Sequence, residues 1–209
     1  MTPAPTPAPT PRPTIVLASK SRSRAAILSG AGVPYETEDS GVDEAALKAR
    51  LLAQGATPRD VAERLGEAKA LAVSARRPGD IVVGADQTLD LAGQLFDKAA
   101  DVAEARARLV AMRGRGHALH GGLVVAEGGA VVWRTTETSR LWMRGFSDAW
   151  LDGYLARGGE ALLGSVGCYL LEGEGAQLFE RIEGDYFAIL GLPLLPLLAF
   201  LRERGAIGT

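Results

Sequence analysis

Short apolar runs, separated by polar helical stretches, recur along most of the chain. The β-branched run 81–83 follows the turn-forming pair Pro78-Gly79, and this pattern predicts a buried strand that ends at Gly84. The apolar run 15–18 predicts a second short strand.

Signals for helix starts are also present. Thr57 stands directly before Pro58, as a cap stands before the first helical residue, so we expect a helix from Pro58 to about Ala75. Its apolar stripe is predicted to consist of Val61, Leu65, Ala68, Ala72 and Ala75. Further strands are expected over 34–38, 119–126, 130–134, 135–143 and 177–182, a hairpin over 88–96, and helices over 25–28, 45–53, 102–112, 148–156 and 194–202.

Asp86 is the first candidate for chemistry. It follows the predicted strand 81–84, and ligands of open α/β sheets bind beyond the carboxyl ends of strands. Gly84 and Ala85 would leave space for such a ligand, which makes Asp86 a candidate catalytic carboxylate. The alternative is a structural aspartate that closes a turn through its own backbone.

A polar segment lies between the strand 15–18 and the next helix. Residues 19–24 contain three serines, one lysine and two arginines, which are well suited to phosphate oxygens at a helix start. Ser19, Ser21 and Arg24 are therefore candidate anion-binding residues. The alternative is an ordinary capped and solvated helix start, and the segment lacks the glycines of a Walker loop.

Four further charged residues are candidates for the site, and the acids and Lys69 also have a purely structural interpretation. Asp43 and Glu44 are either first-turn acids of a helix or, for Glu44, a metal carboxylate. Lys69 lies beside the apolar stripe and is either a surface lysine or part of a site. The predicted hairpin returns Lys98 towards Asp86, where its ammonium would neutralise phosphate charge.

Composition excludes several classes of protein. The net charge of −2 over 209 residues disfavours a large nucleic-acid interface. Cys168 is the single cysteine, so there is no disulfide framework, which fits a reducing cytoplasm. His117 and His120 would face opposite sides of a strand, which argues against zinc.

The two ends of the chain have distinct compositions. Residues 1–14 repeat Thr, Pro and Ala and are expected to form a disordered tail ahead of a single domain over 15–209. The longest apolar run, 190–201, is interrupted by Gly191, Pro193 and Pro196, so no membrane span is expected.

Four separated stretches form a family pattern when they are read together. They are Leu17-Ala18-Ser19-Lys20-Ser21-Arg22-Ser23-Arg24; Gly84-Ala85-Asp86-Gln87 with Lys98; Gly114-Arg115-Gly116-His117; and Glu172-Gly173-Glu174-Gly175 with Ile182-Glu183-Gly184-Asp185-Tyr186 and Gly191-Leu192-Pro193. In order and spacing, from about Ile15 to the C-terminus, they resemble the Maf proteins, nucleotide pyrophosphatases first named for septum formation.

The resemblance implies a fold and an activity. The fold is α/β, a long twisted mixed sheet with flanking helices and two lobes around a nucleotide cleft, similar to inosine triphosphatase. The activity is cleavage between the α- and β-phosphates of a nucleoside triphosphate, with a divalent metal, usually Mg²⁺. Family members are often homodimers.

The resemblance also assigns roles to residues. It makes Asp86 the general base or a metal carboxylate beside it, and Glu44 a ligand of the metal or water. Substrate-binding roles fall to Ser19, Ser21, Arg24, Lys69, Gln87, Lys98 and Glu172. A hard metal ion suits a site rich in acids and poor in Cys and His.

Departures from the family pattern bear on the substrate. Arg22 and Ser23 replace the usual Pro and Arg, and Ala99 replaces the Pro after the lysine. Gln87, Glu172 and the absence of an Asp-Lys pair at 164–165 resemble the branch that acts on 7-methyl-GTP rather than the branch for dTTP and UTP. A carboxylate near the base would favour a cationic, methylated purine. The alternatives for Glu172 are a metal ligand or an acid at the rim of the site without a role. The rival hypotheses are a dTTP/UTP pyrophosphatase, a cell-division regulator that acts by binding a partner, and a nucleotide-binding module without turnover.

Overall fold

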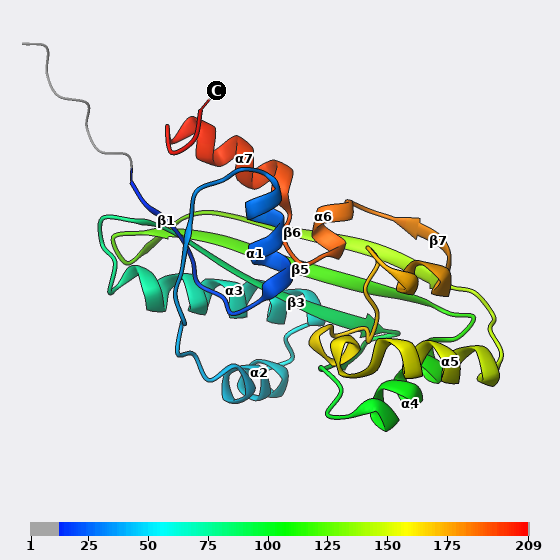
Figure 1. The fold of residues 1–209 in the computed structure, drawn as a ribbon. Coiled ribbons are helices and arrows are strands. Elements are labelled where there is room, and N and C mark those ends of the chain that lie inside the picture. Colours follow the sequence, from blue (N-terminus) through cyan, green and yellow to red (C-terminus); the bar gives the residue numbers. More distant parts are fainter. Residues whose placement is uncertain (1–12, 209) are drawn as a thin grey trace, which may run out of the picture.

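A mixed sheet of seven strands organises the molecule (Figure 1). The computed structural model describes residues 13–208. The strand order is β2-β1-β3-β5-β6-β7, and β4 pairs with the far end of β3. The strands are β1 (Ile15–Leu17), β2 (Glu36–Thr37), β3 (Ile81–Leu91), β4 (Gln94–Phe96), β5 (Gly116–Glu127), β6 (Ala130–Met143) and β7 (Phe179–Glu183).

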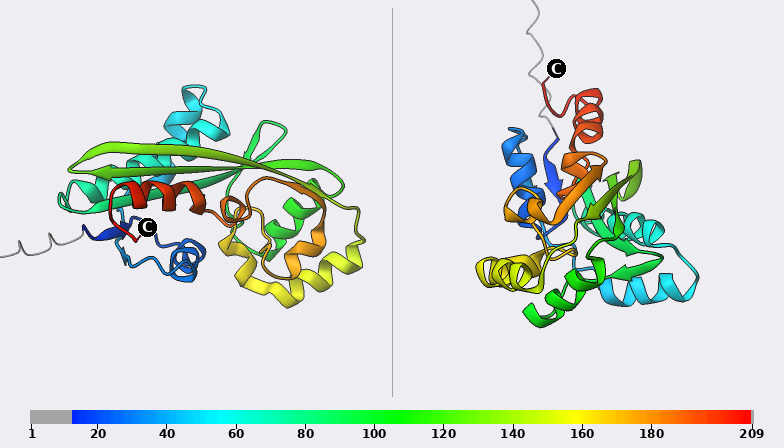
Figure 2. Two further views of the ribbon diagram at one scale, coloured as in Figure 1. Left: turned by 90° about the horizontal axis from the view of Figure 1, so that it is seen from above. Right: turned by 90° about the vertical axis from the view of Figure 1, so that its right-hand side faces the viewer.

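Helices cover both faces of this sheet (Figure 2). They are α1 (Arg22–Gly30), α2 (Glu44–Ala53), α3 (Pro58–Ser74), α4 (Val102–Met112), α5 (Asp148–Gly158), α6 (Tyr186–Ile189) and α7 (Leu194–Glu203), with 3₁₀ turns at Gly159–Gly164 and Glu174–Leu178. The predicted α/β class, mixed sheet and flanking helices are confirmed. Within residues 13–208, no helix combines the length and apolar character needed to cross a membrane.

Two apolar clusters form the two lobes. Residues of α1 and α7, including Leu28 and Leu197, pack with Val83 of β3, whereas residues of α4 and α5, including Leu109, pack with Leu89 of the same strand. Since side chains of a strand alternate between faces, Val83 and Leu89 lie on one face of the sheet. The lobes therefore stand at the two ends of the long strands, and α3 covers the opposite face.

The prediction that the central strand ends at Gly84 is wrong. β3 continues to Leu91, because it pairs in antiparallel register with β5 from Val82 opposite Ala126 to Asp90 opposite Ala118. Asp86 therefore lies in the middle of a strand rather than in the turn after one. The separate strands expected over 130–134 and 135–143 are likewise one strand, β6, with an irregularity near Met143.

The buried face of α3 also differs from the predicted stripe. Val61 and Leu65 are buried as expected, but Ala68 and Ala72 are half-buried and Ala75 is exposed. The buried face of α3 is rotated relative to the predicted stripe because small residues of the helix pack onto the sheet. Lys69 therefore lies on the buried side of α3.

The Pro-rich tail expected over 1–14 lies, as far as residue 12, outside the described residues. The carbonyl of Thr14 already accepts a hydrogen bond from the amide of Ile81 at 2.9 Å. The pairing with β3 therefore begins at this residue.

Candidate active site

Three glycines bring α3 very close to the sheet. A Cβ on Gly84 would lie 2.2 Å from the carbonyl oxygen of Gly66 and 2.5 Å from the amide nitrogen of Ala70. A Cβ on Gly122, which stands opposite Asp86 on β5, would lie 2.4 Å from the carbonyl oxygen of Ala62. The expectation that Gly84 clears space for a ligand is therefore wrong, since the space is filled by the backbone of α3.

This close approach joins α3 and β3 through one ion pair. Nζ of Lys69 lies 2.7 Å from Oδ1 of Asp86, and both residues are buried, at 5% and 9% exposure. The same Nζ lies 2.8 Å from Oε2 of Glu44, the first residue of α2. Because a lysine has three donors, one ammonium holds both carboxylates. The structure thus brings together the predicted base, the predicted metal acid and Lys69.

The turn before α1 supplies hydroxyls and a buried cation. Ser21 caps α1 by accepting a hydrogen bond from the amide of Arg24, and Ser19 accepts one from the amide of Ser21 at 3.2 Å. The guanidinium of Arg24 donates to Oγ of Ser19 at 3.1 Å and to the carbonyl of Gly191 at 2.8 Å. Burial lowers the pKa of Arg24, and the charges of Asp86 and Glu44 oppose this shift. An arginine remains charged at neutral pH in any case.

These groups line one cavity of about 890 Å³, a volume suited to a nucleotide. The cavity lies beside the middle of β3, between the stretch that pairs with β1 and the stretch that pairs with β4. All nine residues singled out from the sequence line it: Ser19, Ser21, Arg24, Glu44, Lys69, Asp86, Gln87, Lys98 and Glu172. They come from six separate parts of the chain.

The side chains of Gln87 and Asp86 point to opposite faces of the sheet, since the two residues are neighbours in β3. The amide of Gln87 donates to the carbonyls of Ala188 at 2.9 Å and Ile189 at 3.1 Å, so it ties β3 to α6. Lys98 and Glu172 are exposed residues at the rim of the cavity.

The carboxylates of the cavity can be compared with the oxygen ligands that a hard metal cation such as Mg²⁺ requires. Among residues 13–208, no cluster of three or more His, Cys, Asp or Glu side chains is arranged to hold a metal ion. Glu44 and Asp86 nevertheless both pair with Lys69, and all three residues line the cavity. Mg²⁺ is commonly held by one or two carboxylates together with substrate phosphates and water. The two carboxylates fit Mg²⁺ that arrives with a triphosphate, and they do not fit a cage built from protein ligands alone.

The sequence reasoning missed Lys48 and several apolar residues of the cavity. Lys48 lies one helical turn after Glu44 on α2 and pairs with Asp97, next to Lys98. The spacing of four residues was a usable signal, because it places both side chains on one helix face. No local pattern marked Tyr169 or Phe96, whose places in the cavity depend on contacts between distant segments.

The remaining predicted candidates lie outside the catalytic groups. Nε2 of His117 lies 2.8 Å from the hydroxyl of Tyr169, whereas His120 pairs with Thr138, so the histidines do not converge on a metal. Cys168 is buried, and burial raises the pKa of its thiol, as expected for a packed residue.

Comparison with known proteins agrees with the motifs. The family model described as Maf-like protein matches residues 14–204. A nucleoside triphosphate pyrophosphatase of Caulobacter vibrioides is 59% identical over 92% of this chain and 96% of its own length. A 7-methyl-GTP pyrophosphatase of Rhizobium meliloti is 49% identical over 92% of this chain and 97% of its own length. The chain belongs to the Maf family.

Proposed function

We propose that this Maf-family nucleoside triphosphate pyrophosphatase hydrolyses the α–β phosphoanhydride of 7-methyl-GTP, releasing the nucleoside monophosphate and pyrophosphate. One observation carries the proposal: the Asp86–Lys69–Glu44 cluster and the serine-rich turn before α1 line the same cavity.

Each group has a role in the reaction. Asp86 accepts a proton from, or orients, the attacking water at the α-phosphate. Ser19, Ser21 and Arg24 bind the phosphate chain at the start of α1, where the backbone amides favour an anion. Lys69 and Lys98 offset the negative charge that grows on the non-bridging oxygens and on the leaving pyrophosphate. Mg²⁺ held by Glu44 and Asp86 would supply Lewis-acid stabilisation of the same charge.

Two lining segments of the cavity differ in charge. Lys20, Arg22 and Arg24 surround the proposed phosphate end, whereas the lining segment 160–172 contains Glu160 and Glu172 and no lysine or arginine. A 7-methylguanine base is cationic, so it is attracted to the acidic end while the triphosphate is attracted to the basic end. The names of relatives such as the Rhizobium meliloti protein support this substrate, and the Caulobacter vibrioides relative is named more generally.

A pyrophosphate-release screen with Mg²⁺ tests the proposal. The substrates are 7-methyl-GTP, GTP, dTTP and UTP, each assayed for kcat/KM. The highest kcat/KM is expected for 7-methyl-GTP. A preference for dTTP and UTP would instead favour the other family branch, and tight binding of every nucleotide without pyrophosphate release would contradict the enzymatic proposal.

The cell-division hypothesis needs its own test. Under the enzymatic proposal, a gene that encodes the Asp86→Asn variant fails to reproduce any division phenotype that the wild-type gene causes. If that variant reproduced the phenotype in full, partner binding rather than catalysis would explain it. We also propose a cytoplasmic location and a homodimer, which fractionation and light scattering test.

A further inference from the structure

The segment that carries Glu44 is held mainly by polar contacts. Residues 38–43 connect β2 to α2, and α2 contains no buried residue, while Ser40 alone is buried within 38–43. Apolar packing therefore does little to place this segment. Polar contacts, several of them to its backbone, connect it to α3 instead.

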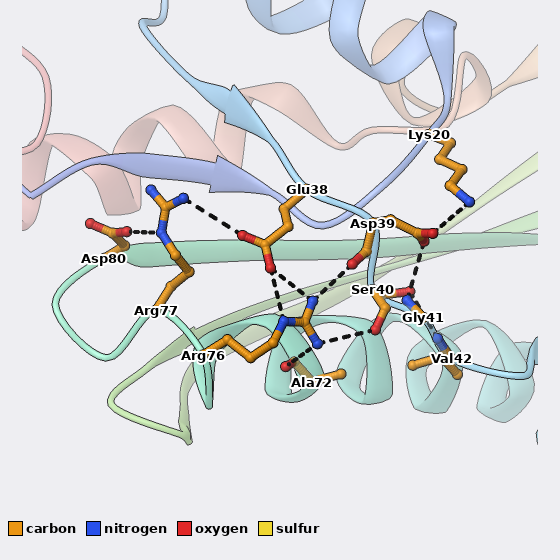
Figure 3. A network of polar contacts seen from close by, with 10 residues as sticks. All are labelled: Lys20, Glu38, Asp39, Ser40, Gly41, Val42, Ala72, Arg76, Arg77 and Asp80. Carbon is orange, nitrogen blue, oxygen red and sulfur yellow. Dashed lines mark hydrogen bonds and ion pairs between the residues drawn. The ribbon is translucent and has the colours of Figure 1, made fainter.

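Arg76 makes those contacts (Figure 3). It follows the end of α3, and its guanidinium donates to the backbone carbonyls of Asp39 at 2.8 Å and Ser40 at 3.5 Å. It also donates to Oε1 of Glu38 at 2.9 Å and to the carbonyl of Ala72 in α3 at 2.9 Å. One planar side chain thus binds the loop at three consecutive residues and stays fixed to its own helix.

Lys69 lies in the last two turns of α3, and Arg76 follows the end of the same helix. Lys69 holds Glu44 directly, at 2.8 Å, and Arg76 holds the loop that leads into Glu44. The same loop reaches the phosphate-binding turn, because Asp39 pairs with Lys20 at 2.5 Å (Figure 3). A second cavity of about 320 Å³ lies along this loop and is lined by Lys20, Glu44 and Lys69 among others.

We propose that Arg76 is a positioning residue for catalysis: it fixes the backbone of 39–40 so that Glu44 stays against Lys69 and Asp86. The inference rests on the proposed function, in which Glu44 binds Mg²⁺. A lysine cannot replace Arg76, because an ammonium lacks the planar fork that reaches two carbonyls and a carboxylate together.

The test compares Arg76→Lys with Arg77→Lys. Arg77 is the matched control, since it belongs to the same network but pairs with carboxylates, at 2.8 Å from Glu36, 2.5 Å from Asp80 and 3.6 Å from Glu38. In Arg76→Lys we expect the half-saturating Mg²⁺ concentration to rise about tenfold, the low end of the effect seen when residues that orient metal ligands are replaced. For Arg77→Lys we expect a half-saturating Mg²⁺ concentration within about twofold of the wild-type value.

Hydrogen exchange supplies a readout that is independent of turnover. Amides of residues 39–47 should exchange faster in Arg76→Lys than in Arg77→Lys or wild type, in nucleotide-free protein. Suppose that Arg76→Lys shows wild-type hydrogen exchange and wild-type Mg²⁺ dependence while the Glu44→Gln enzyme is impaired. This result would overturn the inference about Arg76 and leave the proposed function standing. An unimpaired Glu44→Gln enzyme would contradict the role of Glu44 in the proposed function and overturn the inference with it.

Discussion

Nζ of Lys69 lies 2.7 Å from Oδ1 of Asp86, and the lysine is 5% exposed. A buried carboxylate without such a partner would be costly to keep ionised. The third member, Glu44, is more exposed and shares the same ammonium at 2.8 Å. The ion pair thus places a carboxylate and an ammonium side by side in the lining of the cavity.

Asp86→Asn should abolish turnover without unfolding the protein. The amide keeps the shape of the side chain but cannot accept the proton of water, so we expect kcat to fall by at least about 100-fold. The measurement is pyrophosphate release together with a thermal unfolding curve. Asp90→Asn on the same strand is the control, because Asp90 binds the amide of Gly93 in the hairpin. Equal losses in both variants would contradict a special role for Asp86.

Gly84→Ala should weaken both fold and activity. Its Cβ would lie 2.2 Å from the carbonyl oxygen of Gly66, so α3 must move away from β3. We expect the free energy of unfolding to fall by about 1–3 kcal/mol, which urea unfolding measures. Turnover should fall as well, since Lys69 moves with α3. Gly79→Ala, with open space around its Cβ, should change neither quantity.

Arg24→Lys should weaken substrate binding. An ammonium lacks the planar fork with which the guanidinium reaches Oγ of Ser19 at 3.1 Å and the carbonyl of Gly191 at 2.8 Å. We expect KM to rise about tenfold, equivalent to roughly 1.4 kcal/mol. Steady-state kinetics with the preferred nucleotide measure this change. Arg22→Ala should have the smaller effect because Arg22 is exposed; the reverse ranking would show that Arg22 has taken over the role.

Glu172→Gln should reduce the preference for a cationic base. Glu172 is exposed at the rim of the cavity, so its charge is screened and we expect the kcat/KM ratio of 7-methyl-GTP to GTP to fall about two- to fivefold. Glu174→Gln is the matched control two residues away, because Glu174 pairs with Arg157 at 3.0 Å. An unchanged ratio in Glu172→Gln would argue against charge recognition at this position.

His117 should make stability depend on pH. Burial lowers its pKa from 6.5 to about 4, so the unfolded chain takes up a proton first as the pH falls. The contribution of His117 to the free energy of unfolding is complete above pH 6.5. It is lost progressively as the pH falls to about 4, by on the order of 3 kcal/mol. Urea unfolding at pH 7.5 and 4.5 measures it. His117→Phe should flatten this slope; a slope equal to that of wild type would assign the effect to other groups.

The sequence by itself determined the local elements and the list of site residues. Helix caps such as Thr57, Asp101 and Ser147 are local, because each side chain accepts a hydrogen bond from the amide three residues onward, and the cap predicted at Thr57 is confirmed. The hairpin over Ala92-Gly93 is also local. The family motifs led to nine residues that line one cavity, although their chemical roles stay predictions.

Only the tertiary structure decided the length of β3 and the burial of Lys69. β3 extends past Gly84 because β5, some thirty residues later, supplies hydrogen bonds as far as Asp90. Lys69 is buried because Gly84 lets α3 approach, a contact between residues far apart in the chain. Long-range pairing and close backbone packing leave no local periodicity, so neither could be read from neighbouring residues.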